Sequence, residues 1–351
     1  MSVNDAPSCC SAKGKDDAKR WRTSLFASLA HPALKIKIDL ESLLVIGIFA
    51  ALFLLVVFVP NAANQTVQDG SNGIFLGVVA AMLIIFIIAL FSGKDDFQKT
   101  TDIFLIIGIL LLAWEIFIGK LSLLDPFLFP SPEKVFAVFA GDYNIMISGL
   151  ISSVTILMSG YILAVTVAVP LALLIGWRKR AFAVAYPIAK AVSPIPPTVY
   201  LPYAIVLLPT FSSASVFVIF IGAFWPLFVG TVHGVFNIDR RILNSARTLG
   251  LKEHVMLSKI VLPAALPSVF SGATIALILS FITLTVAEMI AATSGLGWYI
   301  EYQHQYANYD KVIAGMILMG ATVVVVMWFF RPHPEVLPAL AESGRILKHY
   351  R

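Results

Sequence analysis

The sequence predicts an all-α fold, a polytopic bundle of transmembrane helices in a lipid bilayer. Of the 351 residues, 59% are hydrophobic and only 13% are charged, whereas a soluble domain carries about 25% charged residues. The apolar residues come in runs long enough to cross a hydrocarbon core of about 30 Å, which takes about 20 residues of helix. Both observations indicate one helical bundle rather than two soluble domains.

A polar tail of 40 residues precedes the first apolar run, and we expect it to lie in the cytosol. Its two cysteines, Cys9 and Cys10, are adjacent and cannot form an ordinary disulfide across the fold. Residues 1–10 contain no apolar stretch of the kind found before the cleavage site of a signal peptide. The tail therefore indicates little about function.

Eight apolar segments follow as candidate membrane spans. They cover residues 42–59, 74–91, 103–118, 145–176, 182–208, 215–235, 269–291 and 312–330. In the fifth segment, Pro194, Pro196 and Pro197 remove three backbone donors within four residues, so a continuous helix is not expected there. A broken helix at membrane depth persists only if it is buried or lines a water-filled cavity.

The orientation follows from the lysines and arginines, because positive charge is retained on the cytosolic side of a membrane. With eight spans, 21 of the 25 basic residues fall in the two termini and the alternate connections on one side. We therefore expect a multi-pass protein with both termini in the cytosol. The net charge of +5 reflects this topology, and no nucleic-acid surface is inferred from it.

One cytosolic connection, residues 236–268, is longer than the others and has a regular amphipathic pattern. Its first apolar residues recur at helical spacing before a glycine stop: Ile242, Leu243, Ala246, Leu249 and then Gly250. A second short helix, expected to end at Leu262–Pro263, has these residues on one face: Val255, Met256, Ile260 and Val261. The pattern predicts a bent helix pair at the membrane surface, which could shield the bundle or dock a partner.

Two strings in this connection carry a resemblance to a known family. They are Asn244-Ser245-Ala246-Arg247-Thr248-Leu249-Gly250 and Ile260-Val261-Leu262-Pro263. They resemble the "EAA" loop of permeases of binding-protein-dependent ABC importers, which docks in a groove of the ATPase subunit. The resemblance implies ATPase coupling for Asn244, Ser245, Ala246, Arg247, Gly250, Ile260, Leu262 and Pro263. The glutamate usual in this loop is Asn244 in this chain.

Further strings extend the resemblance from about residue 125 to residue 327 and are similar to the nitrate, sulfonate (taurine) and bicarbonate branch. They are Leu128-Phe129-Pro130-Ser131-Pro132, Pro194-Ile195-Pro196-Pro197, Gly222-Ala223-Phe224-Trp225-Pro226, Ala287-Glu288-Met289 and Ser294-Gly295-Leu296-Gly297. The arginine often found before the Pro-Ile-Pro run is Ser193 here. The spans at 42–59 and 74–91 have no counterpart in the six-span core of that branch.

The resemblance implies a type I ABC importer permease. A cytosolic tail (1–40) and two additional transmembrane helices (41–95) would precede a six-span core (96–332, with its coupling loop at 236–268) and a cytosolic C-terminal tail (333–351). Two permease subunits, expected to form a homodimer, would work with ATPase subunits and an extracytoplasmic solute-binding protein. They would lie in the bacterial cytoplasmic (inner) membrane and import a small anionic solute.

No Gly-x4-Gly-Lys-Ser/Thr loop is present to hold phosphates, so ATP and Mg²⁺ would be bound by the partner ATPase, and no cofactor is expected in this chain. The histidines show no metal-ligand spacing and no nucleophile turn occurs, so neither a metal site nor catalytic residues are expected. The alternative is a secondary transporter or channel independent of ATP, which would be expected to show ion-coupling carboxylates or an inverted repeat. A membrane-bound enzyme or scaffold is a further alternative, and no buried acid/base pair indicates it.

The fifth span holds the first candidates for a solute pathway. Lys190 could face the pathway and attract an anion, or it could extend back to the cytosolic headgroups. Pro194, Pro196 and Pro197 free backbone carbonyls, which could line a cavity.

Two further candidates lie near the opposite side of the membrane. Glu288 could form part of a gate or be hydrated at the interface. Tyr299 belongs to an aromatic run, 298–306, which suits an interfacial belt or a docking surface for the solute-binding protein. Glu115, near the outer end of the third span, is expected at the interface.

Overall fold

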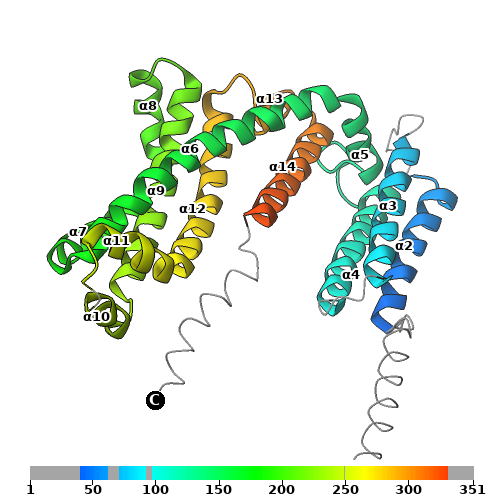
Figure 1. Cartoon of the computed structure of the whole chain (residues 1–351). Helices are drawn as coiled ribbons and strands as arrows, with labels where there is room; N and C mark the ends of the chain where they lie inside the picture. The colour runs from blue at the N-terminus through cyan, green and yellow to red at the C-terminus, as the bar shows by residue number, and fades with distance from the viewer. Residues whose placement is uncertain (1–39, 62–70, 92–96, 249, 331–351) are drawn as a thin grey trace, which may run out of the picture. The chain divides into compact units, whose positions relative to one another are not determined.

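The computed structural model describes residues 40–61, 71–91, 97–248 and 250–330, which form helices joined by short connections (Figure 1). These residues contain no strand, so the all-α expectation is confirmed. The tails predicted at 1–40 and 333–351 lie, apart from Leu40, outside the described residues.

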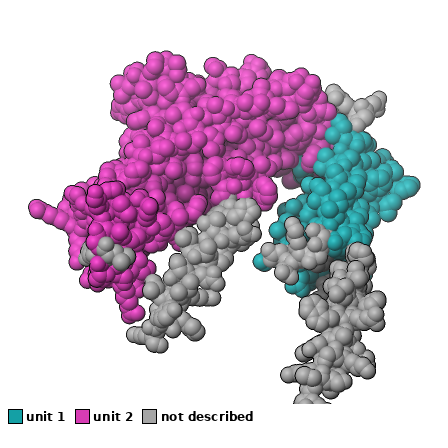
Figure 2. Space-filling view, in the orientation of Figure 1, with its two compact units in different colours: residues 1–63, 72–121 teal, residues 64–71, 122–351 magenta. Residues whose placement is uncertain are grey.

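The chain divides into two compact units (Figure 2). The first unit comprises residues 1–63 and 72–121, and the second comprises residues 64–71 and 122–351. The third predicted span falls in the first unit, whereas the resemblance grouped it with the helices that follow. The reason is packing, since this helix lies against the first span.

Among the described residues, the first unit contains three apolar helices: α2 (Leu40–Phe58), α3 (Ser71–Phe91) and α4 (Phe97–Trp114). The ring of Phe104 packs against those of Phe49 and Phe86, at centroid distances of 6.5 and 5.4 Å. Large aliphatic side chains cover the outer faces of α2 and α3, as contact with lipid requires. Helix α4 continues as a π-helix, η1 (Glu115–Lys120).

The second unit contains twelve elements in the described residues. They are α5 (Pro132–Gly141), α6 (Tyr143–Trp177), α7 (Lys179–Val192), η2 (Pro197–Tyr200), α8 (Leu201–Leu207), α9 (Phe211–Phe236), α10 (Arg240–Thr248), α11 (Glu253–Met256), η3 (Leu257–Val261), α12 (Leu262–Ala291), α13 (Leu296–Gln305) and α14 (Tyr309–Phe329). Helix α9 packs between α6 and α12 and makes the core of the unit with them.

Glycines let these three long helices approach closely. A Cβ added to Gly160 of α6 would lie 2.7 Å from a methyl carbon of Ile219 on α9. A Cβ on Gly230 of α9 would lie 3.1 Å from the Cα of Gly272 on α12. Small residues are typical of such contacts, because close van der Waals packing holds membrane helices together.

Seven helices of the described residues are long and apolar enough to cross a membrane. They are Leu40–Phe58, Asn72–Phe91, Gln98–Lys120, Tyr143–Trp177, Phe211–Phe236, Glu253–Ala291 and Tyr309–Phe329. These match seven of the eight predicted spans. The fifth predicted span, 182–208, is not a single helix.

The 182–208 segment consists of α7, η2 and α8, and the break falls at Pro194–Pro197 as the prolines predict. It runs antiparallel along α9. The ring of Phe182 stacks on Phe236, the last residue of α9, at 3.8 Å, and α8 packs beside the first turns of α9. The segment therefore extends along the 26 residues of α9, or about 39 Å at a rise of about 1.5 Å per residue.

The second helix of the 236–268 connection corrects the prediction. Instead of ending at Leu262–Pro263, α11 continues through the π-helix η3 into α12, and together they form one helix of 39 residues, Glu253–Ala291. Pro263 lies inside this continuous helix, near the junction of η3 and α12, where its missing N–H leaves a carbonyl of the preceding turn without its usual partner. The π segment directly before it adjusts the hydrogen-bond register, as local π turns do around prolines in membrane helices.

Candidate functional site

The short helix α10 lies beyond the ends of α9 and α12, at the opposite end of the second unit from α8 and α13 (Figure 1). The Asp239 carboxylate accepts the backbone N–H of Arg241 at 2.8 Å and so satisfies a free donor of the first turn. The side chains of Asn244 and Ser245 are exposed. They form a polar face that is open to a partner.

Ala246 lies on the inner face of α10 and is only 4% exposed. It belongs to the same core cluster as Met256 and Val261. Its small side chain lets α10 pack onto the bundle, and a coupling role for Ala246 stays a prediction. The side chain of Arg247 lies outside the described residues.

Gly250 follows α10 with a φ of +63°, in the left-handed region that glycine adopts at little cost. A Cβ there would meet no atom within 4 Å, so the backbone conformation rather than lack of space requires glycine. This confirms the predicted glycine stop. Ile260 packs against the bundle core, and Leu262 and Pro263 are half-buried. These three side chains therefore contribute to packing between α10 and α12 and do not form an exposed face.

The broken segment exposes most of the residues predicted to line a pathway. Lys190 is exposed at the end of α7, and Pro194 and Pro196 are exposed within the break. Pro197 is half-buried against α9, where a Cβ on Gly222 would lie 3.0 Å from its ring. Gly222 therefore leaves the room in which the break packs against the core.

Glu288 is fully buried near the end of α12, so the alternative in which it is hydrated at the interface is wrong. Its carboxylate accepts the Ser153 hydroxyl at 2.7 Å and the N–H of Gly297 at 2.8 Å. The Ser153 oxygen also accepts the N–H of Leu296, at 2.8 Å. The buried carboxyl group thus caps the first turn of α13, whose N–H groups have no partner within the helix.

Two glycines make room for the carboxylate. Gly295 has a φ of +119°, and a Cβ there would come within 2.4 Å of Glu288 Oε1. A Cβ on Gly297 would lie 2.8 Å from the Glu288 Cβ. The glycines of the Ser294–Gly297 string are therefore explained by close backbone approach to a buried acid.

A second polar cluster joins α13 to α6 and α14. The Tyr299 hydroxyl donates to Asp142 Oδ2 at 2.8 Å, and the Lys311 ammonium lies 2.8 Å from the same oxygen. Burial alone would raise the pKa of the Asp142 carboxyl, but the hydrogen bonds from Lys311 and Tyr299 and the charge of Lys311 bring it below its ordinary value of 3.8. Burial, and then the bond to Asp142 and its negative charge, raise the pKa of the Tyr299 phenol.

The aromatic run on α13 has two faces. Tyr299 is 1% exposed, so it belongs neither to an interfacial belt nor to an exposed docking surface. Trp298, Tyr302 and Tyr306 instead line up along the outer face, with ring centroids 5.1 and 4.9 Å apart. Trp298, Tyr302 and Tyr306 follow one another at four-residue spacing, which places them on one face of a helix, and Tyr299 lies on another face.

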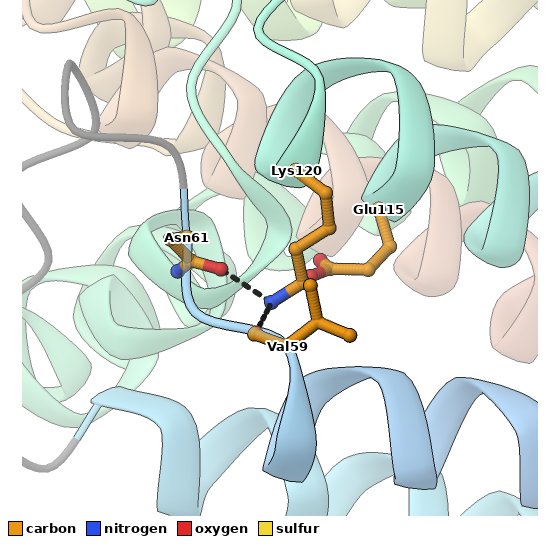
Figure 3. Close-up of polar contacts among 4 residues, drawn as sticks. All are labelled: Val59, Asn61, Glu115 and Lys120. Atoms are coloured by element: carbon orange, nitrogen blue, oxygen red, sulfur yellow. Dashed lines mark hydrogen bonds and ion pairs between the residues drawn. The ribbon is translucent and has the colours of Figure 1, made fainter.

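In the first unit, Glu115 is fully buried rather than interfacial (Figure 3). Lys120 lies 2.9 Å from it, at the other end of the π-helix η1. The same ammonium donates to the Val59 carbonyl at 2.8 Å and to the Asn61 side chain. A buried charge needs a partner, and Lys120 provides one while fastening the end of α2 to η1.

Comparisons with known proteins decide the family. The model of the family described as "Binding-protein-dependent transport system inner membrane component" matches residues 168–331. A probable ABC transporter permease protein of Brucella melitensis is 31% identical over 219 residues, which are 61% of this chain and 89% of that protein. The chain belongs to this permease family. It is therefore a transport component, and its seven long apolar helices make it a multi-pass membrane protein.

Two further relatives carry names that mention solutes. A putative aliphatic sulfonates transport permease protein of Bacillus subtilis is 27% identical over 218 residues, covering 61% of this permease and 78% of that protein. A nitrate import permease protein of Leptolyngbya laminosa is 34% identical over 161 residues, which are 46% of this permease and 58% of that protein. These relatives support the branch that the sequence motifs resemble.

The described residues contain no cluster of His, Cys, Asp and Glu that could hold a metal ion.

Sequence reasoning singled out Glu288 and Tyr299 but missed their partners, Ser153 and Asp142. The partners lie more than 130 positions away along the chain, and no local spacing connects them.

Proposed function

We propose that this chain is the permease subunit of an ATP-driven importer of a small anionic solute. It works as a homodimer with ATPase subunits, which bind ATP and Mg²⁺, and with an extracytoplasmic solute-binding protein. The complex lies in the bacterial cytoplasmic membrane, with both termini of the permease in the cytosol. The observation that carries the proposal is α10, a short helix outside the spans that buries Ala246 and exposes Asn244 and Ser245.

The continuity of the helix from Glu253 to Ala291 supports a mechanical route from the ATPase to the solute pathway. A movement of α10 reaches α12 through the packed core around Ala246 and Met256. Helix α12 carries Glu288 near its far end, where the carboxylate caps α13. Because a helix is stiff along its axis, displacement at the ATPase end shifts the opposite end of the unit as well.

The anionic character of the solute rests on the relatives, which are named for aliphatic sulfonates and nitrate. Lys190 supports it, since an exposed ammonium beside the break at Pro194–Pro197 attracts anions.

The secondary-transporter alternative needs an intramembrane carboxylate that can bind a coupling ion. Glu288 is engaged with Ser153 and Gly297, and Glu115 with Lys120, which argues against that use.

The test uses the exposed face of α10. Ser245→Trp places a bulky side chain in the proposed ATPase contact without disturbing the buried face. We expect the variant to insert normally, to lose copurifying ATPase and to lose ATP-dependent uptake into proteoliposomes. Gln305→Trp, at an exposed position on α13 at the opposite end, is the matched control and should keep its ATPase.

If Ser245→Trp retains a full complement of ATPase and wild-type uptake, the coupling role of α10 is wrong. Uptake by the unmodified permease without any ATPase would favour the secondary transporter instead.

A further inference from the structure

A cavity of about 310 Å³ opens between α9 and α12, beside the break of the 182–208 segment. Its nine lining residues are Ser193, Pro226, Val229, Gly230, His233, Ser268, Ser271, Gly272 and Ile275. The lining of α9 ends at His233, three residues before the helix ends at Phe236. The cavity therefore lies in the half of the bundle nearer α10.

Three serine hydroxyls line this cavity, whereas the hydroxyls of Ser215 and Thr231, which also lack a hydrogen-bond partner, lie outside it. In the part of the chain that the structure describes, the hydroxyls of Ser193, Ser268 and Ser271 make no hydrogen bond to another protein group. Four other hydroxyls of α12 donate to the backbone carbonyl four residues earlier. They belong to Thr274, Ser280, Thr283 and Thr285. A hydroxyl at membrane depth costs free energy unless it has a partner, so three free hydroxyls in one cavity indicate a polar occupant.

The lining favours an anion over a cation. Hydroxyls and an imidazole N–H can donate hydrogen bonds, and none of the nine lining residues has a carboxylate. A Cβ on Gly234 would lie 2.8 Å from the Ser268 hydroxyl oxygen, so glycine at that position leaves this hydroxyl room. A cavity of about 310 Å³ has roughly ten times the liquid volume of a water molecule, which admits a small oxyanion with some of its hydration.

We propose that this cavity is a transit site for the transported oxyanion, of the nitrate or sulfonate kind, on its way to the α10 side. The inference rests on the proposed function and adds the site to it. Neutral donors suit such a site, because a transported anion must bind strongly enough to enter the site and weakly enough to leave it. Lys190 lies in the last turn of α7, three residues before Ser193, which caps the end of that helix, so a basic residue is close in sequence to the cavity lining.

The test measures whether an anion protects the cavity. Cys9 and Cys10 are first replaced by serine, and Ser271→Cys is then introduced into the permease in its complex with the ATPase. The thiol is labelled with a methanethiosulfonate bearing a sulfonate group, in the presence of nitrate, ethanesulfonate or gluconate at equal ionic strength. We expect whichever probe is imported to slow labelling, and gluconate to have no effect.

Thr274→Cys is the matched control. Thr274 is exposed on the same helix, three residues further on, but does not line the cavity. Its labelling rate should not depend on the anion. A slowing of equal size at both positions would reflect a general salt effect and would overturn the site.

A second measurement uses substitutions that fill no space. Ser268→Ala and Ser271→Ala together should lower uptake about tenfold, because two donors to the anion are lost. ATPase copurification should stay unchanged. If the unmodified importer takes up nitrate or ethanesulfonate while both the double variant and the labelling are insensitive, the site is wrong and the proposed function stands. Failure of the unmodified importer to take up either anion overturns both.

Discussion

Glu288 shows how a single residue can organise one end of the molecule. Its carboxylate is fully buried, and it is held by the Ser153 hydroxyl and the Gly297 N–H. An isolated charge in such a place would be very costly, whereas one that caps a helix N-terminus is stabilised by the free N–H groups there. The carboxylate thereby ties α12, α6 and α13 together.

The first prediction is that Glu288→Ala destabilises the permease by about 2–4 kcal/mol, because it leaves the buried donors of Ser153 and Gly297 unpaired. The stability of Glu288→Gln should fall between those of the unmodified protein and Glu288→Ala, since glutamine keeps one acceptor oxygen. Thermal unfolding of the purified protein in detergent measures both effects. Glu253→Gln is the control, because Glu253 is exposed at the other end of the same helix. Equal melting temperatures for Glu288→Ala and the unmodified protein would refute the capping role.

The second prediction concerns the pH dependence of the Asp142 cluster. The pKa of the Asp142 carboxyl is lowered below its ordinary value of 3.8, so its stabilising effect is present above that value and is lost as pH falls through the lowered pKa. The pKa of the Tyr299 phenol is raised above 10.0, so its effect persists up to that value and is lost only at higher pH. The cluster should therefore hold α13 to α6 and α14 across the neutral range.

Melting temperatures of the unmodified permease and of Asp142→Asn, measured from pH 7 down to pH 3, test this. The variant should melt lower at neutral pH, and the difference should shrink as pH falls below about 4. Lys134→Gln serves as the control, because Lys134 lies on the nearby helix α5, whereas the ion pair of Asp142 is with Lys311. A difference that stays constant with pH would contradict the assignment.

Single residues divide clearly into those that sequence reasoning can place and those that it cannot. Gly250 was predictable, because an amphipathic pattern ending in glycine is a local signal, and its φ of +63° agrees. The environment of Glu288 was not predictable, because Ser153 lies on another helix and no local pattern links them. The inward orientation of Ala246 could in principle have been inferred from its place on the apolar face with Ile242 and Leu249.

At the scale of elements, the main difference from the sequence is the continuity of α11, η3 and α12. The apolar spacing predicted the two helices of the 236–268 connection, but Pro263 suggested a stop. A proline inside a membrane helix is tolerated where the local hydrogen-bond register adjusts around it, and Pro263 closely follows the π segment η3. The break at Pro194–Pro197 was predicted correctly, because three prolines within four residues leave no helical alternative.

The third prediction follows from this continuity. Lys259 is exposed within η3, so Lys259→Pro interrupts the helix between α10 and α12 without removing a buried side chain. An interior proline costs a helix about 3 kcal/mol, so we expect a hinge at this point. ATP hydrolysis should continue while uptake per ATP hydrolysed falls. Lys259→Ala keeps the helix and should preserve the ratio, and an unchanged ratio in the proline variant would exclude α12 as the transmitting element.

On the scale of the whole molecule, the number of membrane crossings decides where the termini lie. Seven helices within the described residues are long enough to span, and an odd number of crossings would put the two termini on opposite sides. The segment from α7 to α8 extends along α9 from end to end, however, and we expect it to provide an eighth crossing in pieces. Eight crossings also agree with the positive charge, since 21 of the 25 basic residues then share one side.

The last prediction tests that eighth crossing directly with single cysteines in a background lacking Cys9 and Cys10. Lys179→Cys lies where α7 begins, Ser212→Cys lies in the first turn of α9, and Asn237→Cys follows the end of α9. If the broken segment crosses, an impermeant maleimide added outside intact cells should label only Ser212→Cys. The other two variants should react only after the membrane is opened. Labelling of Lys179→Cys and Ser212→Cys from the same side would mean that α7, η2 and α8 form a re-entrant loop, and the termini would then lie on opposite sides of the membrane.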